Sequence, residues 1–257
     1  MFLCYRVVIT GYNFAWLIYN IYLYRAKLFI FLTNWTYLIL NLYFLRATAF
    51  TIGAFYCEYK RSQRETSPST NSGKEEMNVQ VEMEPDDENA ESADAALPAA
   101  TEVSREEDAL RFQHKLLWLL YIISANAGLL VTVGYWTVLY EDDEPVDANN
   151  ITKHALNSVF MLIDTMLCSI PVRLFHFIYP LLYIMIYLGF TVVYWVLGGT
   201  NIQGQPYIYE LLDYNNYEAS TGSLVGFFLL VVQPVLQLIL FGFVKLRDCL
   251  YRRRKQN

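Results

Sequence analysis

Charged residues are scarce in this chain, and most of the acidic ones lie in one segment. The 257 residues are 17% charged, against about 25% in a typical soluble domain. Segment 75–108 holds 13 of the 25 acidic residues and one basic residue, which leaves 18 basic and 12 acidic residues elsewhere. The net charge of −6 therefore describes one insert. The remainder, in a chain with 55% hydrophobic residues, has the composition of an integral membrane protein.

Short motifs for common soluble chemistries are also missing. The four cysteines (Cys4, Cys57, Cys168 and Cys249) show no CxxC pattern and no metal-ligand spacing, and no Gly-rich phosphate loop occurs. We therefore expect no metal and no other cofactor. The basic C-terminal run "YRRRKQ" is better explained by membrane topology and anionic lipid than by a nucleic-acid partner.

Long apolar stretches are the main feature that is present. A membrane-spanning helix needs about 20 mostly apolar residues, and Tyr and Trp gather near the ends of these stretches, as they do at membrane interfaces. The sequence predicts an all-α, polytopic membrane protein with about six transmembrane helices. The first stretch contains Arg6; a cleaved signal peptide is the alternative there, although it lacks a basic n-region and a small-residue cleavage site. The stretches are 2–20, 28–50, 116–139, 153–172, 176–197 and 222–246.

Basic residues in short loops predict the orientation. The strongly basic C-terminus is expected in the cytosol, and six spans then place the N-terminus there too, in the plasma membrane or the endoplasmic reticulum. Arg25, Lys27 and Lys153 depart from this rule, because they fall on the outer side. The predicted organisation is two transmembrane helices in 1–57, a disordered acidic cytosolic linker in 58–112, four transmembrane helices in 113–247, and a basic cytosolic tail in 248–257.

The linker is rich in Ser, Glu, Asp, Ala and Pro, so it cannot bury enough apolar surface to offset its ordering entropy. It is either a solvated spacer or a segment that binds a protein partner. Two kinds of modification site are also predicted. Asn150 begins an Asn-Ile-Thr glycosylation sequon on the outer side, and Cys57 and Cys249 lie near the inner interface as lipidation candidates, with ordinary packing as the alternative.

The stretch "KHALNSVFMLID" (153–164) carries unusual polar residues for a membrane helix. At 100° per residue, His154, Asn157 and Asp164 fall within about 80° of one face. Asp164 in such a place must be protonated or paired, with Arg46 or Arg173 as the candidates. Thr33 in the second stretch enters the membrane to a depth similar to that of His154, at 1.5 Å per residue.

Two interpretations of these polar residues stay open. Thr, Ser and Asn often join membrane helices by hydrogen bonds. Alternatively, His154 activates the Thr33 hydroxyl as a nucleophile, with Asn34, Asn157 or Asp164 lining or orienting the pocket. Such a site near the lipid boundary would suit a lipid ester that enters from the bilayer.

Three blocks carry a resemblance to known families: "FLTNWTYLIL", "HALNSVFMLID" and "GQPYIYELLDY". Together they resemble the rolling stone family of multi-span animal membrane proteins, whose founding member is associated with myoblast fusion. More distantly they resemble the androgen-induced membrane hydrolases, six-span proteins that cleave fatty-acid esters of hydroxy fatty acids with a catalytic threonine and histidine.

The resemblance to the hydrolases implies roles for individual residues. Thr33 follows Phe31-Leu32 in the place of the nucleophile, and Asp164 matches a carboxylate of the motif. His154 matches the first of two histidines, but Asn157 occupies the place of the second, catalytic one, and an amide cannot act as a general base. Either His154 replaces it, or the pocket serves binding or structure. We therefore predict a rolling stone-type membrane protein with a cell-surface or developmental role, and an intramembrane lipid ester hydrolase as the alternative.

Overall fold

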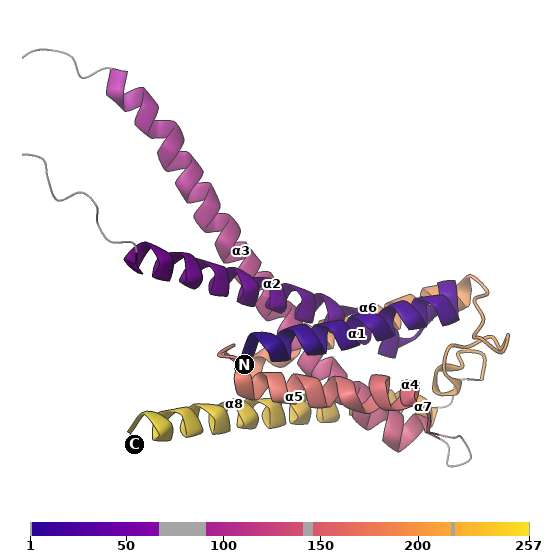
Figure 1. Ribbon diagram of the computed structural model, residues 1–257. Coiled ribbons are helices and arrows are strands. Elements are labelled where there is room, and N and C mark those ends of the chain that lie inside the picture. Colours follow the sequence, from indigo (N-terminus) through magenta and orange to yellow (C-terminus); the bar gives the residue numbers. More distant parts are fainter. Residues whose placement is uncertain (1, 67–90, 141–145, 217–218, 257) are drawn as a thin grey trace, which may run out of the picture. The chain divides into compact units, whose positions relative to one another are not determined.

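A computed structural model describes residues 2–66, 91–140, 146–216 and 219–256, and all the regular structure among them is helical (Figure 1). The chain divides into two units. Unit 1 comprises Met1–Ala49 and Leu117–Asn257, and unit 2 comprises Phe50–Leu116. The predicted all-α class is confirmed.

The helices are of three kinds. Beside the α-helices, η1, η4 and η5 are 3-10 turns, and η2, η3 and η6 are π-helical segments. In chain order the elements are α1 (Phe2–Tyr24), η1 (Arg25–Ile30), α2 (Leu32–Thr66), α3 (Glu91–Gly134), η2 (Tyr135–Leu139), α4 (Ala148–Ile151), η3 (Thr152–Leu156), α5 (Asn157–Leu167), η4 (Leu174–Phe177), α6 (Ile178–Val196), η5 (Glu210–Leu212), α7 (Ala219–Phe227), η6 (Phe228–Val232) and α8 (Gln233–Gln256).

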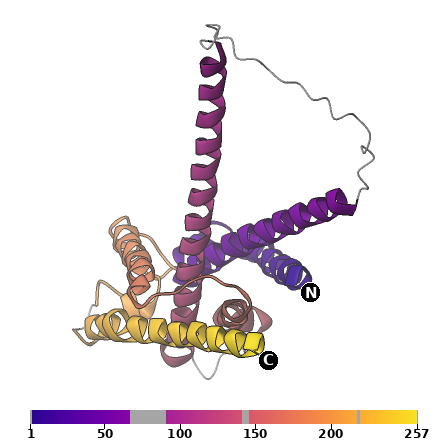
Figure 2. The same cartoon turned by 90° about the vertical axis from the view of Figure 1, so that its left-hand side faces the viewer.

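Four helical runs in the described part of the chain are long and apolar enough to cross a membrane: Leu32–Gln63, Arg111–Leu139, Leu174–Val196 and Gly222–Gln256. The last of these includes α8, drawn in yellow in Figure 2. The other two stretches expected to span are helical as well, in α1 and in η3–α5. Both stretches carry polar residues, and these are buried against neighbouring helices.

Many polar side chains of unit 1 face inward, beside the apolar core, and many large apolar ones face outward. On α1 the buried positions are Arg6, Thr10, Asn13, Leu17 and Asn20, spaced three or four residues apart along one stripe, and four of the five are polar. Conversely, Ile186 of α6 is 65% exposed. This inverts the pattern of a soluble bundle. It is favourable when the surroundings are lipid, where an outward polar group has no hydrogen-bond partner.

The core of unit 1 contains large aromatic side chains from helices that are distant in the sequence. Tyr37, Tyr43 and Phe44 of α2 are fully buried beside Tyr121 of α3 and Leu240 of α8. Lipid is as apolar as these side chains, so close packing and interhelical hydrogen bonds, rather than the exclusion of water, hold such helices together.

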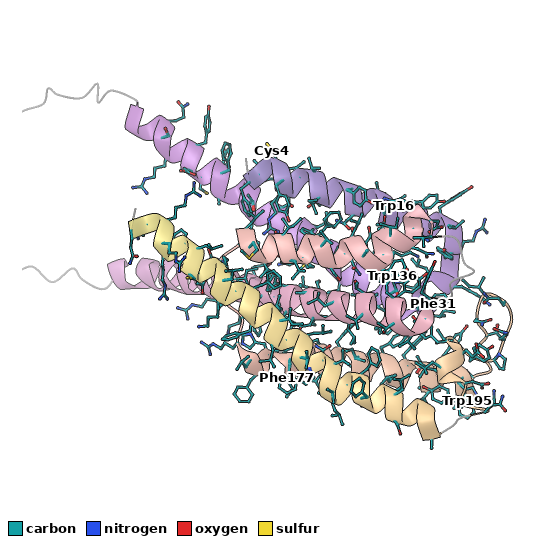
Figure 3. All side chains as sticks on the ribbon, turned by 90° about the horizontal axis from the view of Figure 1, so that it is seen from below. Cys4, Trp16, Phe31, Trp136, Phe177 and Trp195 are labelled. Carbon is teal, nitrogen blue, oxygen red and sulfur yellow. The ribbon has the colours of Figure 1, made fainter. Side chains whose placement is uncertain are left out.

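The two ends of unit 1 differ in what they carry. The start of α1 and the end of α8 lie at one end, and the loop 197–216 lies at the other (Figure 1). In Figure 3, Phe31, Trp136 and Trp195 lie toward the loop end, whereas Cys4 and Phe177 lie toward the other. Both termini therefore belong to the same side of this unit.

Unit 2 contains the distal parts of α2 and α3. Within it, the rings of Phe50 and His114 are in contact, with 5.0 Å between centroids. The expected linker, 58–112, is helical over 58–66 and 91–112, which differs from the prediction, whereas 67–90 lies outside the described residues. Residues 58–66 are rich in Glu, Lys, Arg and Gln, and residues 91–112 are rich in Ala, Glu and Arg; these residue types favour helix without burial.

Candidate functional site

Two adjoining cavities open at the loop end of unit 1. The larger has a volume of about 950 Å³ and is lined mostly by polar side chains, and the smaller, of about 150 Å³, is lined almost entirely by apolar ones. Because they share wall residues, a polar cavity and an apolar cavity lie side by side and together make an amphipathic site. The shared residues are Thr33, Tyr135, Val138, Leu139, Tyr209 and Leu211.

All three π-helical segments of the described chain border these cavities. Tyr135 of η2 lines both, Lys153 and His154 of η3 line the larger, and Phe228 of η6 lines the smaller. A π-turn inserts one extra residue into a helix, and such turns occur frequently at functional sites. Their common location marks these cavities as the candidate site.

Thr33 lies in the first turn of α2 and is 8% exposed. The chain is extended at Phe31 and turns helical at Leu32, whose backbone N–H donates to the Tyr209 hydroxyl at 3.1 Å. That hydroxyl also interacts with the Thr33 side chain, and burial raises the pKa of Tyr209, so its phenol stays protonated at neutral pH. Thr33 is therefore held at a helix N-terminus, the end that carries partial positive charge.

His154 lies on the wall of the larger cavity and is 8% exposed. Its ring stacks on Tyr135 with 3.6 Å between centroids and 8° between planes. Its backbone carbonyl accepts a hydrogen bond from the Trp136 indole at 3.0 Å, and its Nδ1 has no hydrogen-bond partner among the described residues. Among the described residues, no hydrogen bond joins His154 to Thr33. The two predicted catalytic residues share a cavity but do not form a nucleophile–base pair.

Asn157 is fully buried in the bundle and does not line the cavities. Its amide donates to the Lys153 carbonyl at 2.7 Å, and its carbonyl oxygen accepts from the Thr132 hydroxyl at 3.2 Å and from the Ser158 backbone. The predicted arc at 100° per residue does not hold across this stretch, because the π-segment η3 interrupts the α-helical period before Asn157. Asn157 thus joins α5 to α3.

Asp164 also lies away from both cavities, in a buried polar cluster. Its carboxylate is 3.0 Å from Arg6 of α1, an ion contact whose angles differ from those of a hydrogen bond, and it accepts a hydrogen bond from the Tyr43 hydroxyl at 2.5 Å. The prediction that Asp164 pairs with Arg46 or Arg173 was wrong, because its partner is Arg6. Asp164 lies ten residues beyond His154, about 15 Å along a helix, which is the depth that Arg6 occupies.

Lys153 and Tyr209 line the site but were not among the predicted site residues. The Lys153 side chain is buried, with its ammonium 3.4 Å from the Asn34 carbonyl oxygen and 4.7 Å from the centroid of the Tyr24 ring. Its departure from the positive-inside rule was a usable signal. Lys27 departs likewise, and its ammonium binds the backbone carbonyls of Thr200 and Asn201. Tyr209 lies within the block "GQPYIYELLDY", but nothing in the sequence singled it out among the 21 tyrosines of the chain.

The predicted modification sites are at the surface or at the cavity mouth. Asn150 lines the larger cavity, and its backbone N–H donates to the Asp147 carboxylate that caps α4, at 2.6 Å. Cys57 and Cys249 are exposed. Glycosylation and lipidation at these positions stay predictions.

These features define the class: an all-α membrane protein with an amphipathic cavity at one end of its helical bundle. A family model described as "Protein rolling stone" matches residues 99–255. The chain belongs to the rolling stone family, as its three sequence blocks predicted.

One curated relative shows how far the similarity extends. Protein rolling stone of Drosophila melanogaster is 34% identical over 136 residues, which cover 52% of this chain and 49% of the relative. The match thus spans about half the length of that protein. No solved structure matches this chain. The family match includes Lys153, His154 and Tyr209 but begins after α2, the helix that carries Thr33.

Proposed function

We propose that this protein holds a lipid in its amphipathic cavity and acts as a rolling stone-type membrane protein in cell-surface or developmental processes such as myoblast fusion. The observation that carries the proposal is the shared wall of the two cavities. A polar space and an apolar space that meet at Thr33, Tyr135 and Tyr209 fit a molecule with a polar headgroup and an acyl chain.

The proposed setting follows from the arrangement of charge. The basic end of α8 belongs in the cytosol, and the start of α1 lies at that same end. The cavities then open on the extracytosolic side of the plasma membrane or the endoplasmic reticulum. A role at the cell surface requires the plasma membrane.

Photocrosslinking tests the proposed lipid binding. The full-length protein, in bilayer nanodiscs, is exposed to a photoreactive monoacylglycerol, and the labelled peptides are mapped. We expect labelling in 130–139 and 225–232, which line the apolar cavity. In Gly134→Leu the new side chain projects into that cavity, displacing about two methylenes of the probe, so half-saturation should rise about tenfold.

A matched control variant separates this effect from a general effect on helix packing. Gly189 lies on α6, exposed, with open space where a side chain would project. Gly189→Leu should therefore label as the wild type does. Equal labelling of Gly134→Leu and wild type, or labelling confined to peptides outside 130–139 and 225–232, would contradict the proposal.

A lipid ester hydrolase is the second candidate, favoured by the presence of Thr33 and His154 on one cavity wall. Catalytic hydrogen bonds often form only when substrate is bound. A fluorophosphonate probe distinguishes the two functions. Labelling of wild type that disappears in both Thr33→Ala and His154→Ala, at unchanged expression, would establish an activated threonine. An unlabelled, well-folded wild type would leave lipid binding as the function.

A further inference from the structure

The larger cavity contains a buried cation that forms no ion pair among the described residues. Lys153 is 6% exposed, and none of the ion pairs among the described residues joins its ammonium to a carboxylate. Its contacts are the neutral Asn34 carbonyl oxygen and the face of the Tyr24 ring. A buried ammonium is costly unless it is paired, so its position on a cavity wall points to an anion supplied from outside the chain.

The N-terminus of α2 gives the same wall further positive character, and His154 adds a buried polar atom. The N-terminus of α2 begins at Leu32, and its residues Thr33 and Asn34 line the cavity. Helix N-termini favour anions through their free N–H groups and their dipole. The buried Nδ1 of His154, the residue next to Lys153, has no hydrogen-bond partner among the described residues. These groups come from separate elements and line one space.

Acidic side chains lie near Lys153 without forming an ion pair with it among the described residues. Asp147 acts on Lys153 electrostatically, and Glu210 and Asp213 line the same cavity. The Asp213 carboxylate accepts hydrogen bonds from the Asn215 backbone and the Asn216 amide, which lower its pKa. It is thus held as an anion by its own loop.

We propose that Lys153, with the N-terminus of α2, binds the anionic headgroup of a lipid, a carboxylate or a phosphate, whose acyl chain enters the apolar cavity. This inference rests on the proposed lipid binding and adds the charge of the ligand. Tyr135 and Tyr209, which line both cavities, would contact the ligand where headgroup and chain meet.

Three photoreactive probes with the same acyl chain and different headgroups test the inference: a fatty acid, a lysophosphatidate and a monoacylglycerol. Each is added at equal mole fractions to nanodiscs that contain the full-length protein. For wild type we expect half-saturation of one or both anionic probes about tenfold below that of the neutral probe, the scale of one charge-assisted hydrogen bond. The fatty acid and lysophosphatidate arms show whether carboxylate or phosphate is preferred.

Variants locate the preference. Lys153→Met keeps the length of the side chain and removes its charge, so the anionic preference should be lost while the neutral probe binds unchanged. Lys153→Arg should retain it. Lys245→Met is the control, because that lysine lies outside both cavities, with its ammonium over the Phe241 ring, and it should behave as wild type.

The outcomes separate this inference from the proposed function. Equal half-saturation of the three probes in wild type, or a preference that persists in Lys153→Met, overturns the anionic site and leaves lipid binding intact. Labelling by none of the probes contradicts both. The headgroup comparison in wild type needs no variant, so it decides the matter even if Lys153→Met does not fold.

Discussion

At the scale of single residues, the most consequential contact is the buried pair of Arg6 and Asp164. Both side chains are at most 4% exposed, and Tyr43 supplies a hydrogen bond to the carboxylate. The pair connects α1, α2 and α5. Breaking a buried ion pair leaves one uncompensated charge, which costs more than the intact pair contributes.

Asp164→Asn is therefore expected to destabilise the protein by about 3–5 kcal/mol, because Arg6 loses its counter-ion. The double variant Arg6→Met/Asp164→Leu should recover much of this loss. Thermal unfolding in detergent, followed by size-exclusion fluorescence, measures both. Asp248→Asn is the control, since its ion pair with Arg247 is 43% exposed on the carboxylate side, and such pairs contribute about 0–1 kcal/mol. A double variant less stable than Asp164→Asn would contradict this account.

At the scale of elements, the π-segments decide which side chains reach the cavities. Between α4 and α5, η3 changes the register of the helix, so Lys153 and His154 line the cavity while Asn157 packs against α3. Lys27 stabilises the same loop end of unit 1. Its ammonium donates hydrogen bonds to the backbone carbonyls of Thr200 and Asn201, which connects η1 to the loop after α6.

Deletion of Ala155 should convert η3 into regular α-helix and rotate Lys153 and His154 by about 100° relative to α5. The Arg6–Asp164 contact lies beyond the deletion and should hold α5 in place. We expect a folded protein, by size-exclusion profile, that has lost its preference for anionic probes. Deletion of Ile163 within α5 is the comparison, and it should abolish folding because it displaces Asp164. Retention of the anionic preference after deletion of Ala155 would show that the π-turn does not position Lys153.

At the scale of the whole molecule, the inward-facing polar residues and the outward-facing apolar ones adapt unit 1 to lipid. Its termini lie at one end, and its cavities and the loop 197–216 lie at the other. A ligand would therefore reach the site from the side of the membrane opposite the basic tail.

Membrane-impermeant maleimide tests this arrangement in intact cells. Gln203 is exposed in the loop at the cavity end, so Gln203→Cys should be labelled without permeabilisation. The exposed native Cys4 and Cys249, near the two termini, should be labelled only after permeabilisation. Labelling of Cys4 and Cys249 from opposite sides would contradict a unit whose termini lie at one end.

Composition and local pattern by themselves determined the class of this protein. Twenty-residue apolar stretches, aromatic residues at their ends and a basic C-terminus are properties of contiguous sequence, so the all-α membrane fold was predictable from them. The blocks around Thr33, His154 and Tyr209 likewise indicated the rolling stone family. Lys153 was visible as an exception to the charge rule, although its role was not.

The tertiary structure alone decided which polar residues meet. Arg6 and Asp164 are 158 positions apart, and nothing in the local pattern of either one specified the other over Arg46 or Arg173. The division between His154 and Asn157 depends on one π-turn, which a fixed 100° step cannot anticipate. The amphipathic cavity exists because α2, α3, η3 and the loop 197–216 converge at one end, and convergence of distant segments is a property of packing rather than of any segment.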